Sequence, residues 1–238
     1  MFLHLTDNLD INGIPPVDFH IHTNYTDGQA GIEAYVKSAI TRELKAIAIT
    51  DHARKTSTYI PDYCEKIEEL KNSYNLSIYK GVETKIINLD GDIDLSKGIA
   101  EHLDIILGTL HRFPTEQDDK FVSATELMAE DAARIEADST INMIKKKQVD
   151  IIAHPTRIFC ETYNLPFPQE MLREIVKVAK MYGVAIECNA KIPYSKQMLK
   201  ICMEENAILS IGSDAHTPRE VGTAYRYLKS LIRNKTNE

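Results

Sequence analysis

Two histidines, His20 and His22, stand one residue apart in the stretch V-D-F-H-I-H-T-N-Y-T-D-G, residues 17–28. Residues 17–22 read as a strand, and residues i and i+2 of a strand face the same side. The two imidazoles can therefore bind one cation together, because neutral imidazole is a common ligand of zinc, iron and manganese. Asp27 adds a carboxylate five residues later. Alone, this pair is a weak signal, since a histidine at a strand end usually bonds a nearby carbonyl.

Residues of the same kind recur at the ends of six further apolar runs. Six of the eight histidines lie at such ends, which coincidence explains poorly. One ion would be over-supplied with ligands, so the sequence predicts two or three divalent ions, zinc, manganese or iron. Multi-metal sites suit the hydrolysis of phosphate esters. The residues at these ends are Asp51 and His52, Glu83, His111, His154, Glu187 and Asn189, and Asp214 and His216.

The elements that must position these side chains alternate between strand and helix. This alternation predicts parallel strands joined by right-handed crossovers. An open sheet and a closed barrel both satisfy the pattern, but a barrel brings the carboxyl ends of all its strands to one rim. We therefore expect a single α/β domain, a barrel of seven units. Strands are predicted at 17–22, 46–51, 77–83, 104–110, 149–154, 184–189 and 208–214, and helices at 31–44, 62–74, 95–103, 123–147, 168–182, 195–206 and 219–233.

Helix boundaries have their own signals. Ser123 with Glu126 three residues later fits a capping box at the start of the helix predicted over 123–147. Pro168 stands where another helix begins, which suits its fixed φ. Gly183 follows that helix and is expected to end it.

Composition limits the classes of partner. The 238 residues carry a formal net charge of −7, so bulk charge does not favour nucleic acid, and a small anionic substrate needs a local positive site. The four cysteines form no C-x-x-C pair and read as free thiols of a reducing compartment. Neither a signal peptide nor a membrane span is predicted, so we expect a cytoplasmic protein without a membrane partner. The oligomeric state stays open.

An ordered set of motifs resembles the PHP superfamily, named for polymerase and histidinol phosphatase. The set covers residues 17–216, and its order makes it far more specific than any single motif. The whole chain, 1–238, is therefore expected to be one PHP domain, with a motif-bearing core at about 15–217 and a C-terminal helix at about 219–233. The motifs are D-F-H-I-H-T with Asp27, I-T-D-H at 49–52, G-V-E at 81–83, L-G-T-L-H at 107–111, A-H-P at 153–155, E-C-N at 187–189 and G-S-D-A-H at 212–216.

The resemblance implies a distorted (β/α)7 barrel of the TIM-like kind with up to three metal ions. It also implies a stand-alone phosphatase, in which a metal-bridged hydroxide attacks the phosphorus of a small phosphate monoester such as histidinol phosphate. By position, His20, His22, Glu83 and Asp214 would bind the first ion, Glu83, His111 and His154 the second, and Asp27, His52 and His216 the third.

Other residues are assigned from their place beside these motifs. Asp214 or His216 is expected to assist proton transfer. Arg112 and Arg157 each lie just past a motif and are the preferred phosphate-binding pair, because the planar guanidinium suits a phosphate. Asp18, Asp51 and Asn189 are expected to support the ligating histidines.

Several other functions fit parts of the pattern. An amidohydrolase also opens with H-x-H but usually has a lysine at the fourth strand, where this chain has L-G-T-L-H. A regulatory module without activity would be expected to lack ligands, and this set looks complete. A nuclease would want a basic groove with aromatics; a nucleotide phosphoesterase or a protein-tyrosine phosphatase of the same family stays open. Substrate choice is expected to reside in loops 53–62, 84–94, 112–122 and 157–167.

Overall fold

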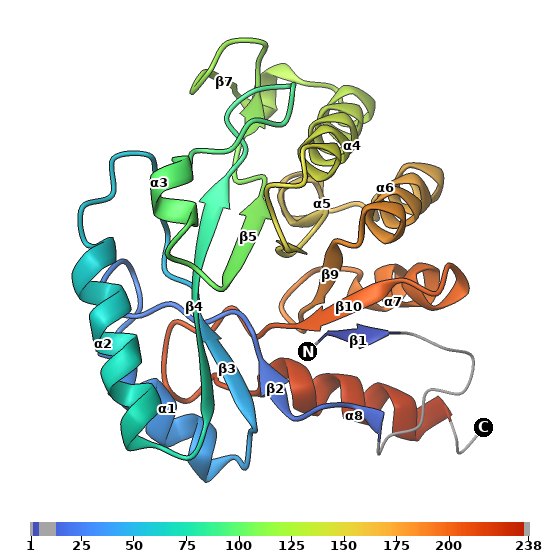
Figure 1. Cartoon of the computed structure of the whole chain (residues 1–238). Coiled ribbons are helices and arrows are strands. Elements are labelled where there is room, and N and C mark those ends of the chain that lie inside the picture. The colour runs from blue at the N-terminus through green and yellow to red at the C-terminus, as the bar shows by residue number, and fades with distance from the viewer. Residues whose placement is uncertain (1, 5–12, 236–238) are drawn as a thin grey trace.

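The fold is a sheet of parallel strands that nearly closes into a barrel, with helices around its outside (Figure 1). The computed structural model describes residues 2–4 and 13–235. Seven strands run parallel, and the short β1 pairs antiparallel with β10. The order across the sheet is β1 (Leu3–His4), β10 (Ile208–Ile211), β9 (Ala185–Cys188), β8 (Ile151–Ile152), β5 (Ile105–Thr109), β4 (Ser77–Lys85), β3 (Ala46–Ile49) and β2 (Val17–Asp18).

The barrel closes between the residues after β2 and those around the end of β10. The Phe19 N–H donates to the Ile211 carbonyl at 2.8 Å, and the His22 N–H donates to the Ala215 carbonyl at 2.9 Å. Ile21 and Ala215 form an isolated parallel bridge between them. The seven-unit barrel expected from the sequence is thereby confirmed.

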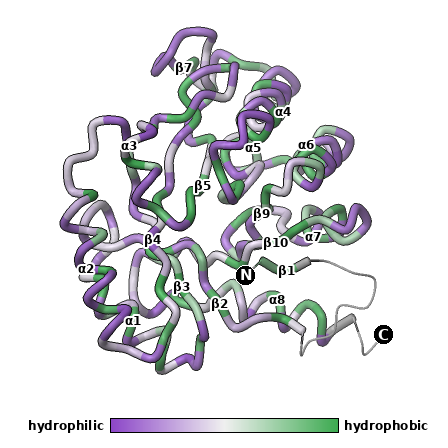
Figure 2. Tube along the Cα trace, viewed as in Figure 1, coloured by the Kyte–Doolittle hydropathy of each residue, from purple (hydrophilic) through white to green (hydrophobic). Residues whose placement is uncertain are grey.

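Helices cover the outside of the sheet, and hydrophobic and polar residues alternate along them (Figure 2). Strands such as β3 and β5 are mainly hydrophobic. Ile47 and Ile49 of β3 and Leu107 of β5 are fully buried, as expected of strands covered on both faces. No described helix has the length and apolar character needed to cross a membrane. The helices are α1 (Ile32–Thr41), α2 (Ile60–Ser73), α3 (Lys97–Ala100), α4 (Ala129–Lys145), α5 (Arg157–Tyr163), α6 (Gln169–Tyr182), α7 (Ser195–Glu204) and α8 (Thr223–Lys235).

The helix predicted over 123–147 is wrong at its start. Ser123 and Glu126 do form the capping box, but it caps a 3-10 turn at Ala124–Glu126. Leu127 is extended at φ −110° and ψ 138°, so the long helix α4 begins only at Ala129. The Tyr163 hydroxyl lies 3.0 Å from the Ala124 carbonyl and 3.2 Å from the Leu127 carbonyl. It thus offers a hydrogen bond to carbonyls at the break between the turn and the helix.

Three further segments differ from expectation. Residues 157–167, expected as a loop, contain helix α5. The C-terminal helix begins at Thr223 instead of about residue 219, because Gly222 has a left-handed φ of 73° that no α-helix accommodates. A small hairpin of β6 (Phe113–Pro114) and β7 (Phe121–Val122) was not predicted, since each strand has only two residues.

Candidate active site

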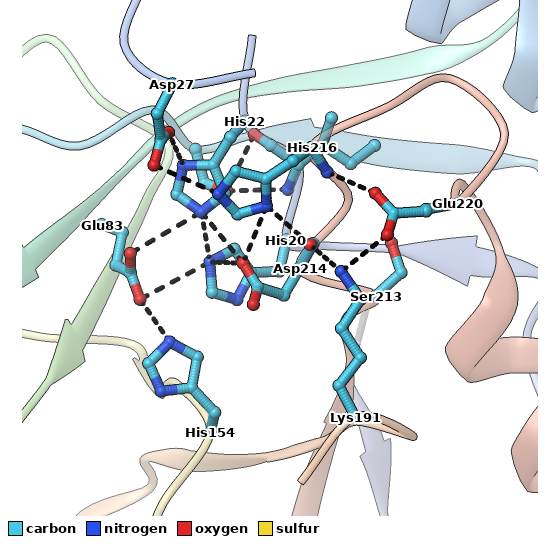
Figure 3. Close-up of polar contacts among 12 residues, drawn as sticks. His20, His22, Asp27, Glu83, His154, Lys191, Ser213, Asp214, His216 and Glu220 are labelled. Carbon is cyan, nitrogen blue, oxygen red and sulfur yellow. Dashed lines mark hydrogen bonds and ion pairs between the residues drawn. The ribbon is translucent and has the colours of Figure 1, made fainter. Parts of the chain in front are cut away.

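The predicted ligands come from different strands and meet at the carboxyl rim of the barrel, where their side chains point toward one another (Figure 3). Within the described residues, three groups of donor atoms could each hold an ion, with the atoms of a group within 4.8 Å of one another. These groups are His20, His22 and Asp214; His20, Glu83 and His154; and His22, Asp27, His52 and His216.

Glu83, at 1% exposure, is the carboxylate around which the imidazoles gather. Its central place agrees with the bridging role that the resemblance implies. From its two carboxylate oxygens, the distances are 2.7 Å to His154 Nε2, 2.9 Å to His52 Nδ1, 3.6 Å to His20 Nε2, 3.6 Å to His22 Nε2 and 3.7 Å to His111 Nε2.

His111 and the two preferred arginines take different places. The His111 side chain is 40% exposed and belongs to none of the three donor groups, although it faces Glu83. Arg157 lines the main pocket above the ligands, and its Nη1 lies 2.9 Å from Asp214 Oδ2. Arg112 does not line that pocket; it lines a smaller neighbouring one. The structure therefore does not place the two arginines on one phosphate.

The main pocket has a volume of about 530 Å³ and opens to solvent directly over the ligand cluster. Its size suits a small metabolite. Carboxylates and histidines make up most of its wall, with Arg157 as the cation among them. The lining residues are Asp27, His52, Glu83, Leu110, His111, His154, Arg157, Ile158, Glu161, Thr162, Asp214 and His216.

Glu187, which the sequence analysis counted among the candidate residues at strand ends without a specific role, supports the ligands. It is fully buried, and its Oε2 accepts hydrogen bonds from His20 Nδ1 and from the backbone N–H of His154, both at 2.9 Å. Asn189 Nδ2 donates to its other oxygen at 2.9 Å. Because His20 Nδ1 donates to Glu187, His20 Nε2 is the ring nitrogen that remains to bind a metal ion. Its position at a strand end beside Asn189 was the available signal.

Asp18 and Asp51 shape the backbone that carries the ligands. Asp51 accepts bonds from the Thr23 N–H at 2.8 Å and the Thr26 hydroxyl at 2.7 Å, which fixes the loop after His22. Asp18 accepts N–H groups of Ser213 at 2.9 Å and Gly222 at 2.7 Å. Burial raises the pKa of Asp18 to about 6, against the lowering effect of these bonds. Among the described residues, both carboxylates bond backbone N–H and hydroxyl groups and not the histidine ring nitrogens that they were expected to support.

Close packing confines one ligand, His20, and two others have unusual backbone angles. A Cβ at Gly212 would lie 2.8 Å from His20 Cβ and 2.9 Å from Glu187 Oε1, so only glycine fits there. His154 and Asp214 have φ values of 30° and 52°, in the left-handed region that residues other than glycine rarely adopt. Such strain is concentrated at functional sites.

The electrostatics of the cluster favour positive charge at its centre. Burial would raise the pKa of Glu83, but His20 and His154 hold it well below its usual range. Burial would lower the pKa of His20, but Glu187 and Glu83 raise it well above the ordinary value. Burial would also raise the pKa of Asp214, but the hydrogen bond with His22 and the charge of His20 hold it well below its usual range. Ionised buried carboxylates need a cation, and a divalent ion supplies that charge.

The donor set fits a metal in its detailed geometry as well. His20 Nε2 and His22 Nε2 lie 2.9 Å apart and point at the same space as Asp214 Oδ1, which is 3.3 Å from His22. Among the described residues, buried His22 Nδ1 has no hydrogen-bond partner, and Asp27 Oδ1 lies 3.6 Å away. Imidazole nitrogens and carboxylate oxygens together suit zinc, manganese or iron.

A buried acid on α4, Glu136, anchors helix α5 and with it Arg157. Its carboxylate accepts the backbone N–H of Phe159 at 3.2 Å and also that of Thr156. Thr156 has a left-handed φ of 68° at the start of this helix. Burial raises the pKa of Glu136 to about 8, although both backbone bonds lower it.

The Glu136→Gln variant is expected to lose part of the pH dependence of stability. The unfolded pKa is near 4.5 and the folded one about 8. Between these values the native state holds a proton that the unfolded state has released. The wild-type free energy of unfolding should therefore fall by about 1.4 kcal/mol per pH unit from this one group, starting above about pH 5. Glutamine keeps an acceptor for Phe159 without titrating.

Urea unfolding at several pH values would measure this difference between the two proteins. The variant should gain stability relative to wild type as the pH rises, and Glu130→Gln, on the exposed face of α4, should not. Parallel pH curves for wild type and Glu136→Gln would contradict the assignment.

Comparisons with known proteins place these features in a family. The sequence model of the PHP domain matches residues 18–191. A protein named probable phosphatase from Thermoanaerobacter sp. (strain X514) is 29% identical over 240 residues, 92% of this chain and 85% of that protein. Another so named, from Acetivibrio thermocellus, is 28% identical over 227 residues, 90% of this chain and 85% of its own length.

A solved structure shares the fold. It is the crystal structure of histidinol phosphate phosphatase from Lactococcus lactis subsp. lactis complexed with zinc, L-histidinol and phosphate. The TM-score is 0.72 at 18% identity, and the match covers 92% of this chain and 93% of that one.

Proposed function

Since the chain belongs to the PHP domain family, we propose that it is a metal-dependent phosphatase that hydrolyses monoesters of small metabolites. The observation that carries the proposal is the group of imidazoles and carboxylates around buried Glu83, open to a pocket that also contains Arg157. The names of the relatives support the same reaction class.

Two or three divalent ions, zinc, manganese or iron, would be held by the three donor groups. His20, His22, Glu83 and Asp214 would hold the first ion, and Glu83 would bridge to the second, held also by His154 and by His111, which faces Glu83 from outside the three groups. Asp27, His52 and His216 would hold the third. Such ions lower the pKa of a water molecule toward neutrality and neutralise charge on the phosphate oxygens.

The protein side chains orient the substrate and handle protons. Arg157, one-third exposed, presents a guanidinium to the pocket from the first turn of α5 and would hold a non-bridging phosphate oxygen. His216 Nδ1 lies 3.0 Å from the Asp214 carbonyl, which only accepts, and its Nε2 lies 3.2 Å from Asp27 Oδ2. In this proposal, Asp214 or His216 assists proton transfer.

The substrate is a small phosphorylated molecule in this proposal, and histidinol phosphate is one candidate. The Lactococcus structure contains L-histidinol and phosphate, and the main pocket has a size that suits such a ligand. All four cysteines are free, which supports a reducing compartment such as the cytoplasm.

Phosphate release from a panel of esters tests the proposal. The panel would contain histidinol phosphate, a sugar phosphate, a nucleoside monophosphate, a phosphotyrosine peptide, p-nitrophenyl phosphate and its diester bis(p-nitrophenyl) phosphate. The chain, stripped of metal and reloaded with manganese, zinc or iron, should turn over a small monoester and favour monoester over diester. Turnover of the diester alone, or of the peptide alone, would contradict it.

A further inference from the structure

A second, smaller pocket lies beside the metal rim, and we call it the basic pocket. It has a volume of about 270 Å³ and shares His111 with the main pocket. Three of its lining residues are cations, and none is a carboxylate, whereas four carboxylates line the main pocket. The lining residues are Arg54, Lys85, Ile86, His111, Arg112 and Phe121.

The cations of the basic pocket differ in their charge pairing, which Lys85 has and, among the described residues, the two arginines lack. Lys85 Nζ lies 5.1 Å and the Arg112 guanidinium 5.7 Å from the centre of the Phe121 ring. Lys85 also pairs with Asp119 at 2.6 Å and with Asp94 at 3.6 Å. Among the described residues neither Arg54 nor Arg112 forms an ion pair. Two guanidinium charges therefore remain uncompensated, and an anion between them would relieve their repulsion.

The fold brings these residues together from three separate segments. Arg54 follows β3, Lys85 ends β4, and Arg112 directly precedes β6, whose partner β7 supplies Phe121. Figure 1 draws β7 beyond the arrowheads of β4 and β5, that is, past the carboxyl ends of these strands. The basic pocket and Arg157 are thus two separate cationic positions, in neighbouring pockets that share His111.

We propose that the basic pocket binds a second phosphate group of the substrate, so that the preferred substrate is a small bisphosphorylated metabolite. This deepens the proposed function and rests on it: one phosphate is cleaved over the metal ligands while the other is held beyond His111. The two unpaired guanidinium groups of Arg54 and Arg112 suit the double charge of a phosphate better than the single charge of a carboxylate, and arginine binds phosphate through its planar fork.

Matched substrate pairs test the proposal. The substrates are α,ω-alkanediol bisphosphates of three to six carbons and n-alkyl monophosphates of the same lengths, so that each pair differs only in the second phosphate. For at least one length, the bisphosphate should have a kcat/KM about tenfold or more above its partner, mainly through a lower KM.

The double variant Arg54→Gln/Arg112→Gln should bring this ratio close to one. Both side chains are exposed, so the variant is expected to fold. The matched control Arg134→Gln removes an exposed arginine that pairs with Glu130 on α4, outside both pockets, and should keep the wild-type ratio. Equal kcat/KM for every pair in the wild type, or an unchanged ratio in the double variant, would overturn the proposal.

A binding measurement separates this proposal from the phosphatase assignment. Calorimetric titration of inorganic pyrophosphate into the full chain, kept free of metal by a chelator, should show a site that the double variant weakens about tenfold or more. If this site is present while no monoester is turned over, the phosphatase assignment fails and the basic pocket stands. If monoesters are turned over but pyrophosphate binds both proteins equally, the basic pocket is refuted alone.

Discussion

The Glu83→Gln variant is expected to lose about a thousandfold or more in kcat/KM for any phosphate monoester that the wild type hydrolyses. Glutamine has nearly the same size and keeps one carbonyl oxygen, so packing at this buried position is preserved. What it removes is the negative charge and the second anionic oxygen. A neutral amide cannot bridge two cations as a carboxylate does.

The large effect follows from where Glu83 lies. One oxygen is 2.7 Å from His154 Nε2, and the other is 2.9 Å from His52 Nδ1. Its oxygens also lie 3.6 Å from His20 Nε2 and His22 Nε2, so the side chain connects the ligands proposed for the second ion with those proposed for the first. Losing it should weaken metal binding at both.

Metal content and initial rates measured on the same samples would check this expectation. Glu83→Gln should retain fewer metal ions per chain than wild type after dialysis, with the same circular dichroism spectrum. The control Glu130→Gln removes a carboxylate that is 79% exposed on α4 and should leave rate and metal content unchanged. A Glu83→Gln protein with near wild-type activity would refute the bridging role.

Replacing Arg157 by alanine is expected to lower kcat/KM by about a hundredfold, which is typical of losing one preorganised donor to a developing charge. Arg157 lines the main pocket, and α5 and Glu136 hold its backbone. Its Nε pairs with Glu161 at 2.9 Å, which orients the fork toward the ligand cluster. Arg157→Lys should recover only part of the loss, because an ammonium lacks the planar pair of donors.

Rescue by free guanidinium separates contact with substrate from a structural role. Millimolar guanidinium should restore part of the Arg157→Ala rate without changing the wild type or Arg134→Ala, whose arginine is on the surface. An Arg157→Ala enzyme within about threefold of wild type would show that Arg157 does not stabilise the transition state.

Much of the site could be predicted because strand ends converge in a parallel barrel. That rule needs only the order of apolar runs and the residues that follow them, so it brought His20, Glu83, His154 and Asp214 to one rim without coordinates. The rule could not predict on which side of the rim the residues after each ligand would lie. Arg112 and Arg157 each follow a ligand closely in sequence, yet their loops lead them into different pockets.

The missed features depend on contacts between distant segments. Glu187 is 167 residues from His20 and 33 from His154, and only the fold shows that it bonds both. Helix α5 starts from a left-handed Thr156 and is fixed by Glu136, so no local capping residue marked it in the sequence. The late start of α4, at Ala129 instead of Ser123, likewise accompanies bonds of the distant Tyr163 hydroxyl to the Ala124 and Leu127 carbonyls.

The most direct test of the metal-dependent phosphatase is a titration of the stripped chain with manganese, zinc or iron, with bound metal and phosphate release measured on each sample. The account expects no release without metal, and release from a small monoester that rises with bound metal until two or three ions per chain are present. Full activity in a chain free of metal would contradict it. So would a fully loaded chain that releases phosphate from no monoester.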